Sequence, residues 1–153
     1  MRYPGKPHRV CDAFVSNCLD LPYSYIDWLG LKHPEIEHGR ALPMSEAEDA
    51  DARRQIVCTS NGQQFGLYST RMIRDDRYKY VWNLTDVDEL YDLDTDPGEK
   101  VNLIAEPAQQ ARIAQMRKDL YAQLQLHGDR FIRSEWIQRQ LLEGKKHLGA
   151  SFA

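Results

Sequence analysis

The sequence predicts an α+β fold in which a small antiparallel β-sheet packs against a C-terminal helix. Between residues 55 and 93, short runs of β-branched and aromatic residues are joined by short turns, which is typical of antiparallel strands. From Glu106 onward, apolar residues recur every three or four positions, which is the period of an amphipathic helix. The chain has 153 residues, the length of one compact domain or of part of a larger one.

A helix is expected near the N-terminus. Asp20 is a favourable cap residue, and Pro22 lies in the first turn, where its missing N–H costs no hydrogen bond. Gly30 is expected to end this helix. Its apolar side chains are Tyr25, Ile26, Trp28 and Leu29. Residues 32–53 are polar and rich in helix breakers, so they predict a long loop at a domain boundary.

The strands follow this loop. "LYSTRMIR" and "RYKYVWN" flank Asp75 and Asp76, and together they predict a β-hairpin. Side-chain alternation places Tyr78, Tyr80 and Trp82 on one face of the second strand and the charged residues on the other. "QIVCTS" and "ELYDL" predict two further short strands at residues 55–60 and 89–93.

Two helices are expected after the strands. The first has an apolar stripe and ends at Gly128, and the second runs from Asp129 to about Glu143. The stripe consists of Ile113, Met116, Leu120 and Leu124, and the second helix carries Ile132, Trp136 and Leu141.

The acidic stretch "DLDTDPG", residues 92–98, raises the question of a calcium loop, a catalytic cluster or a structural turn. An EF-hand that started at Asp92 would place Pro97 where glycine is needed and Leu103 where a glutamate ligand is needed. Catalysis is disfavoured because water would screen carboxylates that crowd a polar turn. Aspartates beside a Pro-Gly pair are typical of turns in which side-chain oxygens accept backbone N–H groups, so a structural role is predicted.

Composition and charge exclude several classes of protein. The net charge of −3 favours neither nucleic acid nor membrane as a partner, and no apolar run approaches the roughly 20 residues that cross a bilayer. The odd number of cysteines, three, disfavours a disulfide framework, and no Cys or His pair has zinc-ligand spacing. The five histidines are scattered and are expected to be solvated surface groups.

The segments "RMIRDDRYKYVWN" and "DELYDLDTDPGEKVNL" resemble the C-terminal subdomain of the sulfatase family. In that family R-x-x-R-x-x-x-Y-K-Y precedes E-L-Y-D-L-x-x-D-P-x-E-x-x-N-L. Upstream, "YPGKPHRVCDAFVSNCLDLPYSYIDWLGL" and "HGRAL" are similar to further family segments, so the order agrees over roughly residues 3–128. The resemblance implies a large α/β domain of the alkaline-phosphatase type, followed by a small antiparallel sheet on a C-terminal helix.

The resemblance also implies a division of this chain. Residues 1–45 would be the terminal, helical remnant of the large α/β catalytic domain. Residues 46–128 would be the C-terminal sulfatase subdomain, and residues 129–153 a further helix and tail. The chain is then expected to be the last third of a sulfatase, whose partner is the N-terminal domain that is missing here.

The implied parent enzyme hydrolyses sulfate esters, of sulfated carbohydrate or aryl sulfate, with a formylglycine nucleophile and calcium. The formylglycine is made from the first residue of C/S-x-P-x-R. Neither Cys11, Cys18 nor Cys58 has proline two positions later, and no serine does. No catalytic residue, metal ligand or cofactor is therefore assigned to this chain, and calcium and formylglycine are expected in the parent enzyme.

In the family, loops of this subdomain close one side of the substrate cleft, and "SNGQQFGLYSTR", residues 60–71, is the best candidate for such a loop. Amide, hydroxyl and guanidinium groups suit sugar hydroxyls and sulfates. The predicted substrate-binding residues are Gln63, Gln64, Tyr68 and Arg71. The alternative is an ordinary loop in which Arg71 pairs with a surface carboxylate.

Two other functions stay open. The chain is alternatively a stand-alone, non-catalytic module that binds an anionic glycan or a protein partner. It is also compatible with the same piece of a phosphonate or phosphate ester hydrolase, because related enzymes share this C-terminal sequence.

Overall fold

The computed structural model describes residues 8, 10, 13–32, 38–43, 53–62 and 68–145. The chain divides into two compact units, residues 1–56 and residues 57–153. The boundaries expected at residues 45 and 128 stay predictions of domain organisation.

The first unit contains helix α1, Asp20–Trp28. Asp20 is its first residue and not its cap, so the expected capping role is wrong. The buried Asp20 carboxylate instead accepts the backbone N–H groups of Ser16 at 2.7 Å and Arg40 at 3.0 Å, and Nη2 of Arg53 at 2.9 Å. Asp20 therefore ties three segments of this unit together. The helix ends as expected near Gly30, which has a left-handed φ of 63°.

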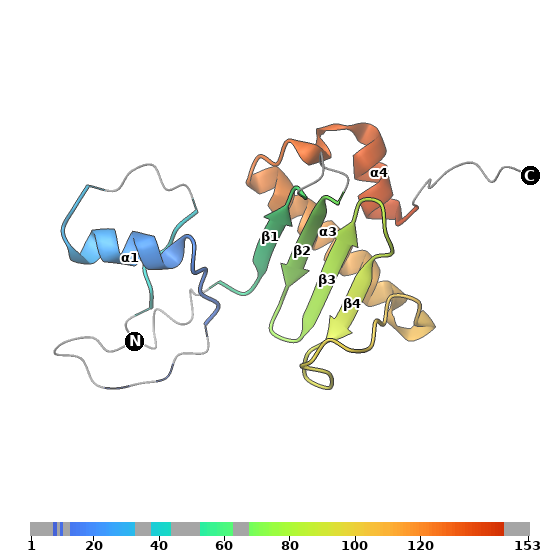
Figure 1. Ribbon diagram of the computed structural model, residues 1–153, viewed down its shortest axis with the longest axis horizontal. Helices are drawn as coiled ribbons and strands as arrows, with labels where there is room; N and C mark the ends of the chain where they lie inside the picture. Colours follow the sequence, from blue (N-terminus) through green and yellow to red (C-terminus); the bar gives the residue numbers. More distant parts are fainter. Residues whose placement is uncertain are drawn as a thin grey trace, which may run out of the picture. The chain divides into compact units, whose positions relative to one another are not determined.

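The second unit is built on a four-stranded sheet with the order β1-β2-β3-β4 (Figure 1). The β2–β3 and β3–β4 pairs are antiparallel, with Ile73 opposite Tyr80 and Tyr80 opposite Leu90. The expected antiparallel sheet is confirmed. The strands are β1, Ile56–Ser60; β2, Thr70–Arg74; β3, Tyr78–Asn83; and β4, Glu89–Asp92.

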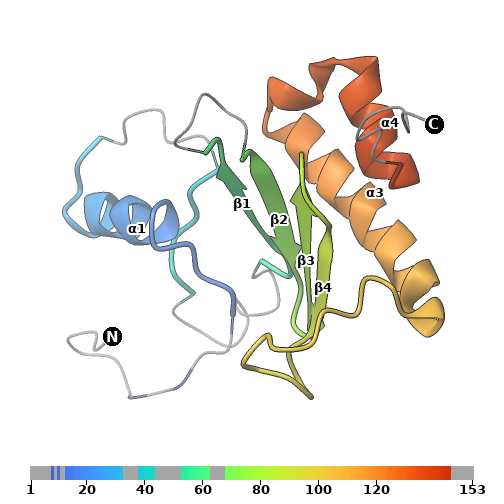
Figure 2. The ribbon, with the colours of Figure 1, turned by 45° about the vertical axis from the view of Figure 1, so that its right-hand side comes forward.

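Helix α3 lies along one face of this sheet, and α4 lies beside α3 (Figure 2). The short helix η1, Pro107–Gln109, leads into α3, Gln110–Leu126. The second expected helix is interrupted: a single turn, η2, Phe131–Arg133, precedes α4, Glu135–Glu143. The interruption lies at Ser134, whose backbone is extended with ψ of 128°.

The core of the second unit lies between the sheet and these helices. The alternation expected along β3 is confirmed, because Tyr78, Tyr80 and Trp82 are all buried. The expected helical stripe is also confirmed, since its four members are 2% exposed or less. Trp136, in contrast, lies on the outer side of α4 and is 50% exposed. The core residues are Ile73, Tyr78, Tyr80, Trp82, Leu90, Ile113, Met116, Leu120, Leu124, Ile132, Ile137 and Leu141.

The acidic turn after β4 has the structural role that its residues predict. Oδ2 of Asp96 accepts the backbone N–H groups of Lys100 at 2.7 Å and Val101 at 2.8 Å. Oδ1 of Asp92 accepts that of Asp94 at 3.2 Å. These carboxylates therefore bind the turn's own backbone. Among the described helices, none is long and apolar enough to span a membrane.

Candidate functional site

Arg71 is the last residue of the predicted substrate segment, and its guanidinium makes hydrogen bonds through every donor. Nε donates to Oδ2 of Asp129 at 2.6 Å, and Nη2 donates to Oδ1 of the same carboxylate at 3.3 Å. Nη1 donates to the carbonyl oxygens of Ser60 at 3.0 Å and Thr70 at 2.8 Å. Nη2 also donates to Oδ1 of Asn61 at 3.0 Å. These contacts occupy all five guanidinium N–H donors, and Arg71 is only 2% exposed.

Strand geometry explains why a charged side chain lies inside. Arg71 is two residues before Ile73, so both side chains point to the face of β2 that the helices cover. Buried charges are tolerated when they are paired and hydrogen-bonded, and Asp129 supplies the pair. The Phe131 ring adds a cation–π contact, with its centroid 4.9 Å from the guanidinium carbon.

The Asp129 carboxylate is itself held in place. Its Oδ1 accepts the backbone N–H of Phe131 at 2.8 Å, and its own backbone N–H donates to the carbonyl of Leu124 at 2.9 Å. Burial by itself would raise the pKa of Asp129. The hydrogen bonds from Arg71 and from the Phe131 N–H, with the Arg71 charge, outweigh burial and lower that pKa below its usual range. The carboxylate is therefore ionised at neutral pH.

Within the candidate segment, the backbones of Gly62 and Tyr68 approach each other closely. Gly62 has a φ of 57°, and a Cβ added to it would lie 3.0 Å from both C and O of Tyr68. Only glycine fits a position that needs a left-handed backbone and such a close approach. The Tyr68 side chain points outward and is 63% exposed.

The predicted site residues therefore have different positions. Tyr68 is accessible to a ligand, whereas Arg71 is buried and uses every donor within the chain. Gln63 and Gln64 lie outside the described residues. Asp129 and Phe131 were not predicted as part of this site, because Asp129 is 58 residues from Arg71 and no motif links them.

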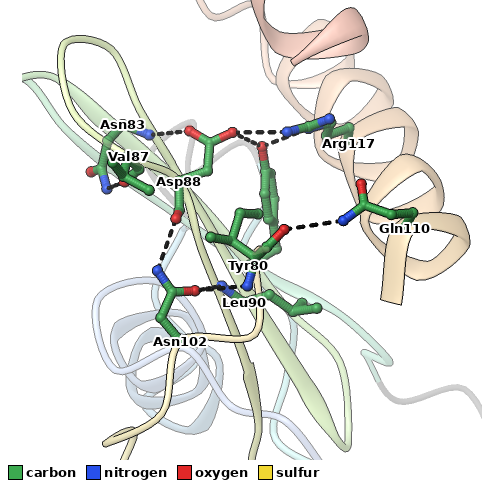
Figure 3. A network of polar contacts seen from close by, with 9 residues as sticks. Tyr80, Asn83, Val87, Asp88, Leu90, Asn102, Gln110 and Arg117 are labelled. Atoms are coloured by element: carbon green, nitrogen blue, oxygen red, sulfur yellow. Dashed lines mark hydrogen bonds and ion pairs between the residues drawn. The ribbon is translucent and has the colours of Figure 1, made fainter. Parts of the chain in front are cut away.

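A second buried polar network lies between the sheet and α3 (Figure 3). The Tyr80 hydroxyl donates to Oδ2 of Asp88 at 2.6 Å, and Nε of Arg117 donates to the same hydroxyl at 3.0 Å. Nη2 of Arg117 also reaches Oδ2 of Asp88 at 3.2 Å. Nδ2 of Asn102 donates to the Asp88 carbonyl at 3.0 Å, while its Oδ1 accepts the Leu90 N–H at 3.0 Å.

This network joins β3, the segment before β4, and α3. Burial, reinforced by the Asp88 charge, raises the pKa of the Tyr80 phenol far above its ordinary value. The phenol consequently stays protonated and acts as a hydrogen-bond donor. Several residues that carry the family resemblance, among them Tyr80 and Asn102, thus serve the architecture of the unit.

Comparison with known proteins adds independent information. Residues 1–126 match the family described as "N-sulphoglucosamine sulphohydrolase, C-terminal". The ulvan-active sulfatase of Formosa agariphila is 24% identical in a gapped alignment 157 positions long, which covers 81% of this chain and 31% of that protein. The Delta 4,5-hexuronate-2-O-sulfatase of Bacteroides thetaiotaomicron is 30% identical over 125 residues, covering 72% of this chain and 26% of that protein.

The fold is also found in solved structures. A 2-O GAG sulfatase superposes with a TM-score of 0.59 at 27% identity, over 72% of this chain and 25% of that one. The chain thus spans less than a third of the length of each of these three proteins. Residues 127–153, which include Asp129 and Phe131, lie beyond the region that matches the family.

Proposed function

Because this chain belongs to the N-sulphoglucosamine sulphohydrolase C-terminal family, we propose that it is the C-terminal domain of an enzyme that hydrolyses sulfate esters of carbohydrate. The named sulfatases among its relatives support a sulfated glycan as the substrate class. The N-terminal catalytic domain would be its partner in the whole enzyme.

We assign the formylglycine and the calcium ion of the proposed reaction to the catalytic domain. The described part of this chain contains no group of three His, Cys, Asp or Glu side chains that could hold a metal ion. The buried Asp92 and the partly buried Asp129 are already paired with arginines. The described residues of this chain thus do not fit the metal.

The proposed role of this domain is to form one wall of the substrate cleft with residues 60–71. Tyr68 is the described residue best suited to contact a sugar, because its hydroxyl can donate and accept while its ring offers an apolar face. Gln63 and Gln64 are proposed as further contacts. The five N–H donors of Arg71 are occupied within the chain. Instead of binding sulfate, as the sequence predicts, Arg71 would hold the ends of this segment in place.

The observation that carries this proposal is the exposed Tyr68 side chain on a segment whose ends are fixed from within. Titration of the ¹⁵N-labelled chain with a sulfated and an unsulfated disaccharide tests it. We expect the sulfated sugar to shift the amide signals of Asn61, Gly62, Tyr68 and Ser69. Tyr68→Ala should weaken binding about fivefold or more, because both the ring and the hydroxyl are lost.

Trp136→Ala is the matched control, because Trp136 is a comparably exposed aromatic residue on α4. Its substitution should leave the affinity unchanged. Shifts spread over the basic surface residues, with equal effects of the two alanine variants, would show nonspecific binding and contradict the proposed wall.

A further inference from the structure

We propose that Asp129 and Phe131 are positioning residues for the described ends of the substrate-facing segment, residues 60–62 and 68–71, and that Arg71 transmits their position to these ends. We call Arg71, Asp129, Phe131, Ser60 and Asn61 the Arg71 clamp. This inference rests on the proposed function, which places residues 60–71 against a sulfated sugar.

The first step is that Arg71 joins two parts of the chain that are distant in sequence. One edge of its guanidinium faces the Asp129 carboxylate. The rest of the group binds the Ser60 carbonyl and the Asn61 side chain, where β1 ends and the candidate segment begins. A planar guanidinium with fixed donor directions transmits position better than a flexible ammonium group would.

The second step is that the acidic half of the clamp is preorganised. Asp129 follows the end of α3 and is held through the Phe131 and Leu124 backbone groups. Phe131 covers the guanidinium and also packs edge-on against the core residue Trp82, with ring centroids 6.0 Å apart. The clamp is therefore anchored to the core, and its ion pair is largely shielded from water, because the Arg71 and Asp129 side chains are 2% and 12% exposed.

The third step is a comparison with the other arginine–aspartate pair of this unit. Arg77 binds Asp92 through Nε at 2.9 Å and Nη2 at 2.6 Å, but Arg77 is 49% exposed. That pair lies at the β2–β3 turn, at the end of β2 opposite to Thr70 and the candidate segment. The Arg77–Asp92 pair is also a two-point arginine–carboxylate interaction, but it makes no contact with residues 60–62. It therefore provides a matched control.

The experiment compares Asp129→Asn and Arg71→Lys with the control Asp92→Asn. Amide hydrogen exchange is followed at Asn61, Gly62 and Ser69, and at Tyr80 and Leu90 in the sheet. We expect Asp129→Asn to accelerate exchange at the first three amides by about tenfold or more relative to the sheet, because a charge-assisted pair is lost. Asp92→Asn should leave these three amides unchanged.

Arg71→Lys separates positioning from charge. The lysine keeps a positive charge beside Asp129 but lacks the planar guanidinium donors that reach Ser60 and Asn61. Hydrogen exchange at the same three amides should therefore accelerate. The affinity for a sulfated disaccharide should fall about fivefold in both clamp variants and stay constant in Asp92→Asn.

Equal acceleration over the whole sheet in Asp129→Asn would mean that Asp129 contributes only to global stability, and the inference would be wrong. Unchanged exchange at Asn61, Gly62 and Ser69 would also overturn it. If the unsubstituted chain fails to bind the sulfated disaccharide, the proposed function fails, while the exchange pattern still decides whether the clamp positions the segment.

Discussion

Tyr80 shows how a single residue can serve three elements at once. Its ring is fully buried in the core, and its hydroxyl lies between Asp88 and Arg117. Arg117 comes from α3 and also packs against Gly144, where α4 ends: a Cβ added there would overlap the guanidinium. Gly144 has a φ of 67°, so its backbone conformation favours glycine at that position. The polar group at the centre of the core thus connects the sheet, α3 and the end of α4.

Replacing Tyr80 by phenylalanine tests this connection. The substitution removes a 2.6 Å hydrogen bond to a carboxylate and leaves Nε of the half-buried Arg117 without its partner. We expect the free energy of unfolding to fall by about 1–3 kcal/mol, measured by urea denaturation.

Tyr91→Phe is the control for the Tyr80 variant. The Tyr91 hydroxyl also donates to a carboxylate, that of Glu89 at 2.9 Å, but it lies on the face of the sheet away from α3. Loss of the Tyr91 hydroxyl should lower the free energy of unfolding by a smaller amount, about 0.5–1 kcal/mol. Equal losses of stability in the two variants would contradict the special role of the Tyr80 network.

Helix α3 depends on packing more than on its ends. Its N-cap residue, Gln109, makes no side-chain capping hydrogen bond, and no acidic residue occupies its first turn. Four apolar side chains at three- and four-residue spacing are buried against β2 and β3 instead. Helical stability in proteins comes mainly from such a buried stripe, so α3 should be destabilised when side chains of the stripe are truncated.

Leu120 lies in the middle of this stripe and is fully buried. Leu120→Ala should lower the free energy of unfolding by about 2–5 kcal/mol, because it loses buried apolar surface and leaves a cavity. Leu126→Ala, in the same helix at a side chain that is 69% exposed, should change it by about 0.5 kcal/mol or less. Chemical denaturation followed by circular dichroism measures both, and similar effects at the two positions would exclude the packing explanation.

At the scale of the whole molecule, three described carboxylates of the second unit have lowered pKa values: Asp92, Asp129 and Glu143. The Glu143 ion pair with Arg139 is solvent-exposed and contributes little to stability, so the pH effect depends on Asp92 and Asp129. For Asp92 the main cause is the hydrogen bond from Arg77, and its burial only partly opposes this effect. For Asp129, burial is outweighed by the contacts of the Arg71 clamp. A carboxylate with a lower pKa in the folded state binds protons more readily when the chain is unfolded. Acid therefore favours unfolding of this unit.

The expected pH dependence of stability follows from the lowered pKa values of Asp92 and Asp129 in the folded state. The stabilisation by both carboxylates is complete above their ordinary pKa of about 3.9 and is lost as the pH falls through their lowered values. The melting temperature should therefore decrease steeply from about pH 5 toward pH 2. The Asp92→Asn/Asp129→Asn double variant should melt at a lower temperature near neutral pH and show a flatter decrease. A double variant with the slope of the unsubstituted chain would argue against these two groups as the cause.

The secondary structure and the sheet–helix core could be predicted from sequence because their signals are local. Alternation along β3 identified Tyr78, Tyr80 and Trp82 as inward-facing, and the spacing in α3 identified its buried stripe. Local signals failed at Asp20 and at residues 129–134. There, long-range hydrogen bonds draw the Asp20 carboxylate to Arg40 and Arg53, and an extended Ser134 interrupts the expected helix.

The sequence by itself determined the family, the strand and helix pattern, and the position of the candidate segment before β2. Only the tertiary structure decided what Arg71 does. The sequence pattern and the residue type are equally compatible with two roles for the Arg71 guanidinium. It could bind sulfate, or it could bind a partner within the chain. The choice depends on a carboxylate 58 residues away that folding brings to 2.6 Å, and a contact between such distant residues leaves no periodic signal in the chain.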